Sequence, residues 1–344
     1  MKIKSFFGIL VMFNFGFNQI NSQNINEIFS QKGEVFFSFE YKNKNQLNQL
    51  SNIISIDHKT TASTAYAYAN KQEFIDFLEE GIAYKIVKKQ LRFKTDKTSG
   101  SKSSWNSYPS YQEYVDMMQV FADSFPTICK LHHLGTLNSG REILAVQISD
   151  NVGQKENEPS FLYTSSMHGD ELAGYILTLR LIDEILNGYG NDARLTNLVN
   201  EIDIWINPLA NPDGAYAGGN QDIWGATRYN ANWKDLNRNY PDPQDGQHPD
   251  GNVWQDETLI FMGLADTIDF TISANMHGGA EVCNYPWDTW GNLTADDSWW
   301  QYVSSGYADS CQANSGNGYF NYLNDGITNG WDWYEIDGGR QDYM

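Results

Sequence analysis

Residues 160–165, Ser160-Phe161-Leu162-Tyr163-Thr164-Ser165, form a short and largely apolar run that predicts a buried strand. After Ser166 comes Met167-His168-Gly169-Asp170-Glu171, and apolar residues then recur at helical spacing as far as Gly188. This pattern predicts a strand that enters a helix through a glycine-containing turn. In α/β enzymes such turns present side chains at the carboxyl end of a sheet.

The turn carries an imidazole and a carboxylate three positions apart, His168 and Glu171. Two such groups can bind one cation from a single turn and leave part of its coordination sphere open. Taken alone, the pair also fits a surface histidine and a glutamate that favours the start of a helix. A metal site therefore requires a third ligand elsewhere.

The predicted strands and helices of the rest of the chain indicate where the third ligand lies. Strands are predicted over 142–149, 203–207 and 270–275, and helices over 111–121 and 257–266. Alternating strands and helices predict an open, mostly parallel sheet with helices on both faces. The strand over 270–275 ends in Met276-His277-Gly278, as the first strand leads to Met167-His168-Gly169. Because the carboxyl ends of parallel strands meet in one crevice, His277 is the expected third ligand.

Composition limits the function. The chain has 344 residues, of which 41% are hydrophobic, so it can bury a sizeable core. A net charge of −20 argues against binding to nucleic acid, which needs a basic face. Three cysteines permit at most one disulfide, and the pairing of Cys283 with Cys311 is one of the ways to form it. No pattern in the sequence indicates the oligomeric state.

Four parts are expected along the chain. Residues 1–22 read as a signal peptide, with a basic start and an apolar run too short to span a membrane, which predicts a secreted protein, periplasmic or extracellular. Residues 23–90 predict a small β-α-β-α-β domain that resembles a ferredoxin-like module. Residues 91–107 form a polar linker, and residues 108–344 the large domain. A small domain on an exposed linker suggests a pro-segment removed by proteolysis; a permanent accessory domain is the alternative.

A polar loop separates the strands over 203–207 and 270–275. It runs from Arg228 to Pro241, is rich in asparagine and shows neither helical nor strand period. Its arginines, Arg228 and Arg238, could bind carboxylates or developing oxyanions together with an asparagine amide. The same composition also fits a loop whose asparagines cap its own turns.

These motifs together resemble those of the zinc metallocarboxypeptidases, and most of all the regulatory subgroup that includes carboxypeptidases N, E, M and D. The resemblance covers about residues 108–344 and rests on five motifs in one order: His168-x-x-Glu171, Asn211-Pro212-Asp213-Gly214, Asp235-Leu236-Asn237-Arg238-Asn239, His277-Gly278-Gly279 and Asn284-Tyr285-Pro286. It implies an α/β fold with a mixed, mostly parallel, eight-stranded twisted sheet flanked by helices. It also implies hydrolysis of the C-terminal bond of peptides or proteins by zinc-activated water.

The resemblance assigns roles to single residues. It implies one zinc per chain on His168, Glu171 and His277, with water completing the site. It implies that Arg228 stabilises the oxyanion, that Asn237 and Arg238 bind the substrate's C-terminal carboxylate, and that Tyr334 closes over the substrate. Asp288 and Gln341 match residues of the specificity pocket, and a carboxylate there predicts a preference for C-terminal Lys or Arg. Asp288 could instead cap a turn.

One departure stands out. The general base of the family is a glutamate beyond the mobile tyrosine, which would lie past Met344, and Glu335 directly follows Tyr334 and cannot serve. The chain is therefore expected to be truncated at its C-terminus. Other functions stay open on the same pattern: an N-acyl amino acid deacylase, a peptidoglycan peptidase, or a non-catalytic zinc-binding protein.

Overall fold

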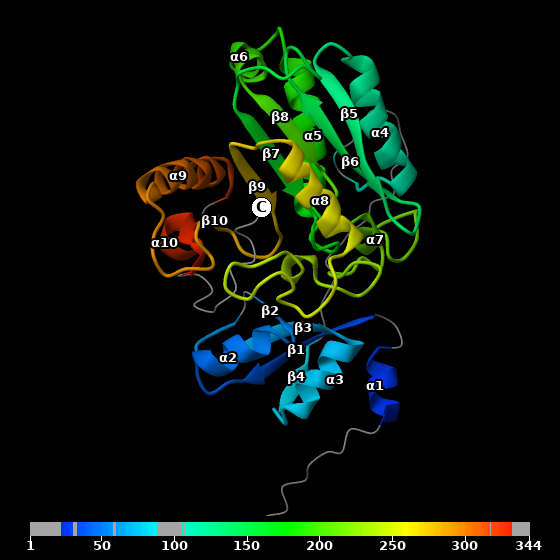
Figure 1. The fold of residues 1–344 in the computed structure, drawn as a ribbon, viewed down its shortest axis with the longest axis vertical. Helices are drawn as coiled ribbons and strands as arrows, with labels where there is room; N and C mark the ends of the chain where they lie inside the picture. The colour runs from blue at the N-terminus through cyan, green and yellow to red at the C-terminus, as the bar shows by residue number, and fades with distance from the viewer. Residues whose placement is uncertain are drawn as a thin grey trace, which may run out of the picture.

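The computed structural model describes residues 22–29, 33–57, 60–87, 105, 107–316 and 318–331. Within them the chain forms a small N-terminal domain and a large domain, which lie one below the other in Figure 1. The expected linker over 91–107 falls almost entirely outside the described residues, as does the signal peptide except for Ser22. Tyr334 and Gln341 also lie outside them. No helix among the described residues is both long and apolar enough to cross a membrane.

The small domain begins with a short helix and continues as an antiparallel sheet with two helices. Its sheet has the strand order β2-β3-β1-β4, which is that of a ferredoxin-like module, and it contains one strand, β2, that the sequence did not predict. Its elements are α1 (Ser22–Ile28), β1 (Glu34–Glu40), α2 (Lys44–Ser51), β2 (Ser55–Asp57), β3 (Thr64–Asn70), α3 (Lys71–Glu79) and β4 (Tyr84–Ile86).

The two faces of this sheet have different partners because side chains alternate along a strand. On β1, Phe37 packs in a core with α2 and α3. Phe36 points to the other face, where it clusters with Tyr68 of β3 and with Tyr229 of the large domain. The face without helices is therefore the one that docks against the large domain.

The large domain is built around a five-stranded sheet of order β5-β6-β8-β7-β9. Two small strands, β10 and β11, pair in parallel beside it. Its elements are α4 (Tyr111–Ser124), β5 (Cys129–Thr136), β6 (Glu142–Ile148), β7 (Ser160–Ser165), α5 (Ala173–Gly188), α6 (Ala193–Glu201), β8 (Asp203–Asn207), α7 (Pro212–Ala215), a turn of 3-10 helix (Leu236–Arg238), α8 (Asp256–Thr267), β9 (Ile272–Met276), β10 (Cys283–Tyr285), α9 (Asp297–Asn314), α10 (Tyr322–Gly326) and β11 (Ile327–Asn329).

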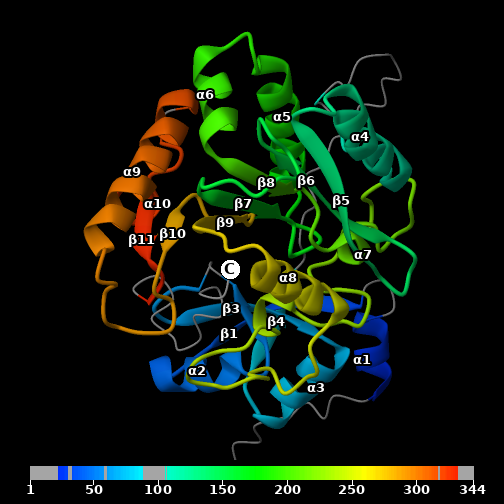
Figure 2. The same ribbon diagram turned by 45° about the horizontal axis from the view of Figure 1, so that its top comes forward.

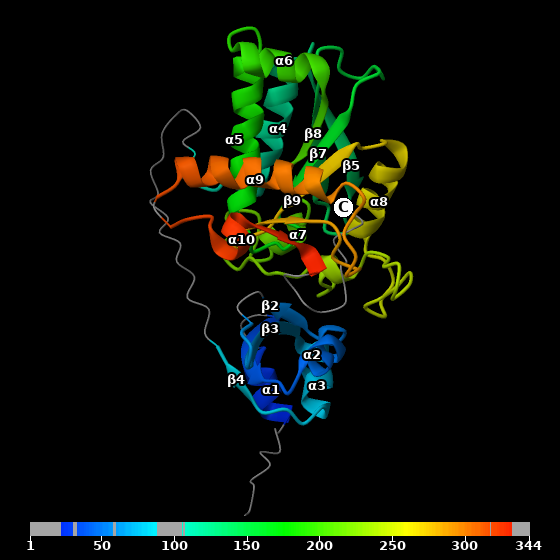
Figure 3. The same ribbon diagram turned by 90° about the vertical axis from the view of Figure 1, so that its left-hand side faces the viewer.

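Helices cover both faces of this sheet, as expected. Leu144 and Val146 of β6 pack in a core with α4, α5 and α6, whereas Ile143 and Ala145 face α8. Figure 3 shows α5 and α8 on opposite sides of the strands. The mixed α/β class is confirmed, together with the helices on both faces.

Two details of the expected sheet differ in the described residues. Its pairings are half antiparallel, because β5 and β6 form a hairpin and β6 pairs antiparallel with β8, while β8, β7 and β9 are parallel. The short connection between β5 and β6 forces that antiparallel pair, whereas β7 is joined to β8 and β8 to β9 by long helical crossovers, which allow parallel pairs. The expected eight strands are not reached within this part of the chain, where the main sheet has five.

Candidate metal centre

The centre lies at the carboxyl ends of two neighbouring parallel strands. Strands β7 and β9 pair with Ser165 opposite Met276, so His168 and His277 emerge side by side at the same edge. Figure 2 shows β7 and β9 next to each other, with the small domain below them. The sequence predicted this convergence from the position of each histidine after its strand.

Local packing fixes the turn that carries His168. Ser166 has a φ of 56° and donates its hydroxyl to the carbonyl of Glu171, 3.0 Å away. The side-chain amide of Asn211 donates to the carbonyl of Met167 at 3.1 Å. A Cβ on Gly169 would lie 2.2 Å from the backbone of Gly214, so only glycine fits at that position. The Asn211-Pro212-Asp213-Gly214 motif thus supports the first ligand from behind.

The three expected ligands converge. Nδ1 of His168 lies 3.0 Å from one oxygen of Glu171, and Nδ1 of His277 lies 2.8 Å from the other. The two Nδ1 atoms are 3.1 Å apart. Two imidazole nitrogens and a carboxylate in this arrangement are the donor set of a catalytic zinc site with an open position, so the residues present fit the metal.

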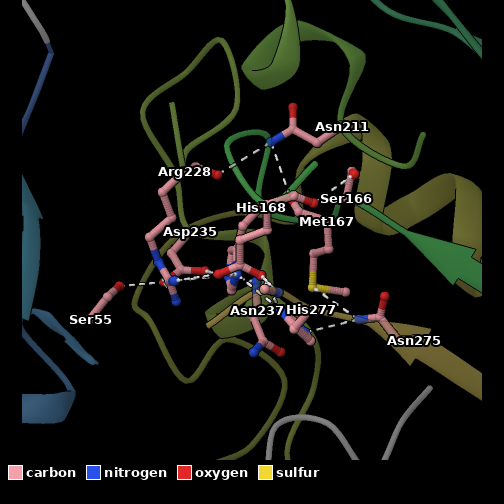
Figure 4. A network of polar contacts seen from close by, with 12 residues as sticks. Ser55, Ser166, Met167, His168, Asn211, Arg228, Asp235, Asn237, Asn275 and His277 are labelled. Carbon is pink, nitrogen blue, oxygen red and sulfur yellow. Dashed lines mark hydrogen bonds and ion pairs between the residues drawn. The ribbon is translucent and has the colours of Figure 1, made fainter. Parts of the chain in front are cut away.

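Each imidazole is also held through its far nitrogen. Nε2 of His168 lies 3.1 Å from the carboxylate of Asp235, and Nε2 of His277 lies 3.1 Å from the amide of Asn275 (Figure 4). The Asp235 carboxylate accepts from Nε2 of His168 and so leaves Nδ1 of that ring to face a metal, and the amide nitrogen of Asn275 fixes the orientation of the His277 ring. The sequence interpretation assigned no role to either residue, although Asp235 opens a motif that it quoted and Asn275 precedes His277 by two positions.

The charges of the cluster are strongly coupled. Burial opposes ionisation of Glu171, but the two imidazoles hold the pKa of its carboxyl well below the ordinary value. Burial also opposes ionisation of Asp235, and Arg228 and His168 together keep the pKa of its carboxyl well below the ordinary value. Burial lowers the pKa of His277, which favours the neutral imidazole that a metal requires. The site is therefore an anionic pocket beside one guanidinium.

Arg228 reaches the same pocket from the loop between α7 and the 3-10 turn. Its Nε and Nη2 lie 3.0 Å from one oxygen of Asp235, and its Nη1 lies 3.6 Å from Glu171. The residue is 8% exposed, and the ring of Tyr68 from the small domain lies 5.4 Å from its guanidinium carbon. The structure thus places Arg228 against two of the three candidate ligands, Glu171 and His168, whose Nδ1 lies 3.2 Å from Nη1.

The other expected site residues lie on two segments. Asn237 is buried, and Arg238, beside it on the 3-10 turn, donates to the carbonyl of Asn237 at 2.9 Å. Asp288 is 5% exposed on the loop after β10, where Asn284 donates to its carboxylate at 2.9 Å. A Cβ on Gly330 would overlap that carboxylate, so β11 leads directly past Asp288.

Known proteins are similar to this chain in sequence. A family model described as zinc carboxypeptidase matches residues 114–344. Human carboxypeptidase D is 36% identical over 269 residues, a match that covers 71% of this chain and 19% of that protein. Mouse carboxypeptidase M is 36% identical over 258 residues, covering 68% of this chain and 55% of that protein. This chain thus spans only part of the length of these relatives.

The fold has solved counterparts too. The crystal structure of a carboxypeptidase A from Helicoverpa armigera superposes with a TM-score of 0.65 at 19% identity, covering 91% of this chain and 85% of that one. At that identity the likeness concerns the fold alone. The resemblance drawn from the sequence motifs is confirmed by the family match and by the relatives. The chain belongs to the zinc carboxypeptidase family.

Proposed function

We propose that this protein is a zinc-dependent carboxypeptidase that hydrolyses the C-terminal bond of peptides and proteins. The observation that carries the proposal is the grouping of His168, Glu171 and His277, whose ligand atoms all lie within 4.8 Å of one another. A zinc ion bound there would supply Lewis-acid polarisation of the scissile carbonyl and of the attacking water.

The neighbouring residues support matching roles. Arg228 places a guanidinium beside Glu171, where it can stabilise the negative charge that develops on a carbonyl oxygen. Asn237 and Arg238 would bind the terminal carboxylate of the substrate. A carboxylate would accept from the side-chain N–H groups of Asn237, whose side-chain oxygen is buried without a hydrogen-bond partner among the described residues. Tyr334 and Gln341 keep the roles that the resemblance gave them.

We also propose a preference for C-terminal Lys or Arg. Asp288 is a buried carboxylate eleven residues beyond His277, and a cationic side chain would pair with it in a site from which water is largely excluded. The acidic body of the protein, with its net charge of −20, would favour the approach of cationic termini.

Metal analysis tests the central proposal. The purified 344-residue chain should bind about one zinc, and His277→Ala should lose most of it. His133→Ala is the matched control, since His133 is an exposed histidine that pairs with Glu142 away from the cluster. Full zinc retention in His277→Ala would remove His277 from the site and overturn the assignment.

Substrate class is tested by binding and hydrolysis. Peptides that end in Arg or Lys should bind to the zinc-loaded protein more tightly than N-acyl amino acids or muropeptides. Binding does not depend on the general base, which the resemblance expects beyond Met344. Preferential binding of muropeptides or of N-acyl amino acids would support one of the other amide hydrolases, and no binding of any class even after removal of the small domain would support a non-catalytic zinc protein.

For the small domain we propose a pro-segment-like role. Its Tyr68 covers the guanidinium of Arg228, so a substrate carbonyl could not reach that side chain while the domain is docked. Cleavage in the linker over 91–107 would release it. A permanent accessory domain would instead leave activity unchanged by that cleavage.

We further propose that the protein is secreted. The support is the pattern of residues 1–22, with Lys2 and Lys4 ahead of an apolar run and Ser22 at its end. N-terminal sequencing of the protein recovered from its native host should begin after this segment. Recovery from inside the cell with Met1 intact would contradict the proposal.

A further inference from the structure

The segment from Arg228 to Asp235, here called the catalytic loop, is held by the small domain along its length. Glu34 accepts a hydrogen bond from the backbone N–H of Arg228 at 3.0 Å, and Glu73 accepts one from the hydroxyl of Tyr229 at 2.9 Å. Asn70 donates to the carbonyl of Trp233 at 2.6 Å. Ser55 donates its hydroxyl to Asp235. These contacts fix the backbone of the loop as well as its side chains.

The contact of Ser55 is directed at the carboxylate that supports the metal centre. One oxygen of Asp235 accepts from Nε2 of His168 at 3.1 Å and from the backbone N–H of Asn237 at 2.9 Å. The other accepts from Arg228 at 3.0 Å and from the hydroxyl of Ser55. Ser55 is 2% exposed and Asp235 is 4% exposed, so water does not compete for these bonds. Figure 4 shows Ser55 reaching the carboxylate from a separate part of the chain.

The tip of the loop also depends on the docked domain. Trp233 has a φ of 57°, an unfavourable conformation for a bulky residue that persists only where surrounding contacts impose it. A Cβ on Gly33 would lie 2.0 Å from the Trp233 ring, so the backbone of the small domain packs directly on the indole. Asn70, at the start of α3, holds the carbonyl of the same residue.

We propose that Ser55 is a positioning residue of the metal centre, which acts from the small domain by holding the Asp235 carboxylate that orients His168. The docked domain then covers Arg228 and at the same time raises the affinity of the large domain for zinc. This inference rests on the proposed zinc site but adds to it a residue from another domain. Mutation of a residue that hydrogen-bonds to a metal ligand commonly changes metal affinity by about tenfold to a hundredfold. Ser55 does not bond to the ligand itself but to Asp235, which bonds to His168, so a smaller effect is expected.

The experiment measures zinc affinity of the full chain by competition with a chromogenic chelator. Ser55→Ala should weaken zinc binding about threefold to tenfold, which corresponds to loss of about one hydrogen bond. Ser55→Thr, which keeps the hydroxyl, should restore most of the affinity. Ser51→Ala is the matched control, because Ser51 is a buried serine of the same domain whose hydroxyl donates to the carbonyl of Asn48 in its own helix.

Each outcome is decisive. Parental zinc affinity in Ser55→Ala, with an unchanged melting temperature, would overturn the inference and leave the zinc site itself intact. Equal weakening in Ser51→Ala would show a general loss of structure and would also overturn it. If Ser55→Ala does not fold, Ser55→Cys, which nearly keeps the shape but is a weak donor, serves in its place and should show the same loss. Failure of the parent chain to bind zinc would instead refute the proposed function.

Discussion

Asp235 accepts a hydrogen bond from Nε2 of His168 at 3.1 Å, and the opposite nitrogen of the same ring faces His277 across 3.1 Å. The carboxylate therefore selects which nitrogen of His168 is left for a metal. It also forms the shorter of the two ion pairs of the buried Arg228, at 3.0 Å against 3.6 Å to Glu171. One side chain thus serves both the metal ligand and the proposed oxyanion donor.

The first prediction follows from this relationship. Asp235→Asn should weaken zinc binding about tenfold to a hundredfold, because the amide no longer fixes the His168 ring with a full negative charge. Competition with a chelator measures the change. Asp203→Asn is the control, since Asp203 lies at the start of β8, at the opposite end of the strand from the site, where it accepts from the amide of Gln147 at 2.8 Å, and its replacement should not weaken zinc binding. Unchanged affinity in Asp235→Asn would mean that the backbone alone orients His168.

The second prediction concerns specificity. Asp288→Ala should lower the affinity for peptides ending in Arg or Lys by at least about tenfold, because a desolvated cation would lose its partner. Peptides ending in Leu should change little, and Asp266→Ala on the exposed side of α8 should change neither class. Calorimetry on zinc-loaded protein gives both affinities. An equal fall for both classes would mean that Asp288 supports the loop after β10 and does not select the substrate.

The third prediction concerns the small domain. A specific protease site inserted within residues 91–104, followed by cutting and removal of the small domain, should raise affinity for an Arg-terminated peptide by about tenfold or more. The reason is that Arg228, now 8% exposed beneath Tyr68, would become accessible. Saturating zinc separates this effect from any loss of metal. The same protease acting on the unmodified chain is the control, and equal peptide affinity before and after removal would favour a permanent accessory domain.

Much of the site could be predicted because its ligands follow directly from local pattern. The strand before His168 was predicted over the residues that β7 occupies, and the strand before His277 within two residues of β9. Once two strand ends are known to be parallel neighbours, the position of a side chain beyond each end is fixed by geometry. The histidines therefore needed no tertiary information beyond the class of fold.

The support of the site could not be predicted in the same way. Ser55 begins a strand of only three residues directly after α2, which is too short to show a period. Its partner Asp235 is 180 positions away, and nothing in either local sequence specifies that the two domains meet there. Helix α9 was missed because its buried residues are the small Ser304 and Ala308, whereas Trp299, Tyr302 and Tyr307 are exposed, so hydrophobic periodicity does not mark its buried face.

The last prediction is a pH dependence of the contact between the domains. The carboxyl of Glu73 accepts from the backbone N–H of Asn70 and from the hydroxyl of Tyr229, each at 2.9 Å, with Asp235 and Lys234 nearby. Burial raises the pKa of Glu73 from 4.5 to about 7, because the hydrogen bonds and Lys234 compensate only in part. Below pH 4.5 the carboxyl is protonated whether docked or exposed, so docking carries no penalty. Between pH 4.5 and 7 the exposed carboxyl ionises while the docked one keeps its proton, and the contact weakens by at most about 3 kcal/mol, a loss that persists above pH 7.

The melting temperature should therefore fall from pH 5 to pH 8 more steeply in the parent than in Glu73→Gln, whose amide cannot ionise. Glu79→Gln, on the exposed end of the same helix, should melt with the parental pH profile. Identical profiles in the parent and in Glu73→Gln would show that Glu73 does not control the docking of the small domain.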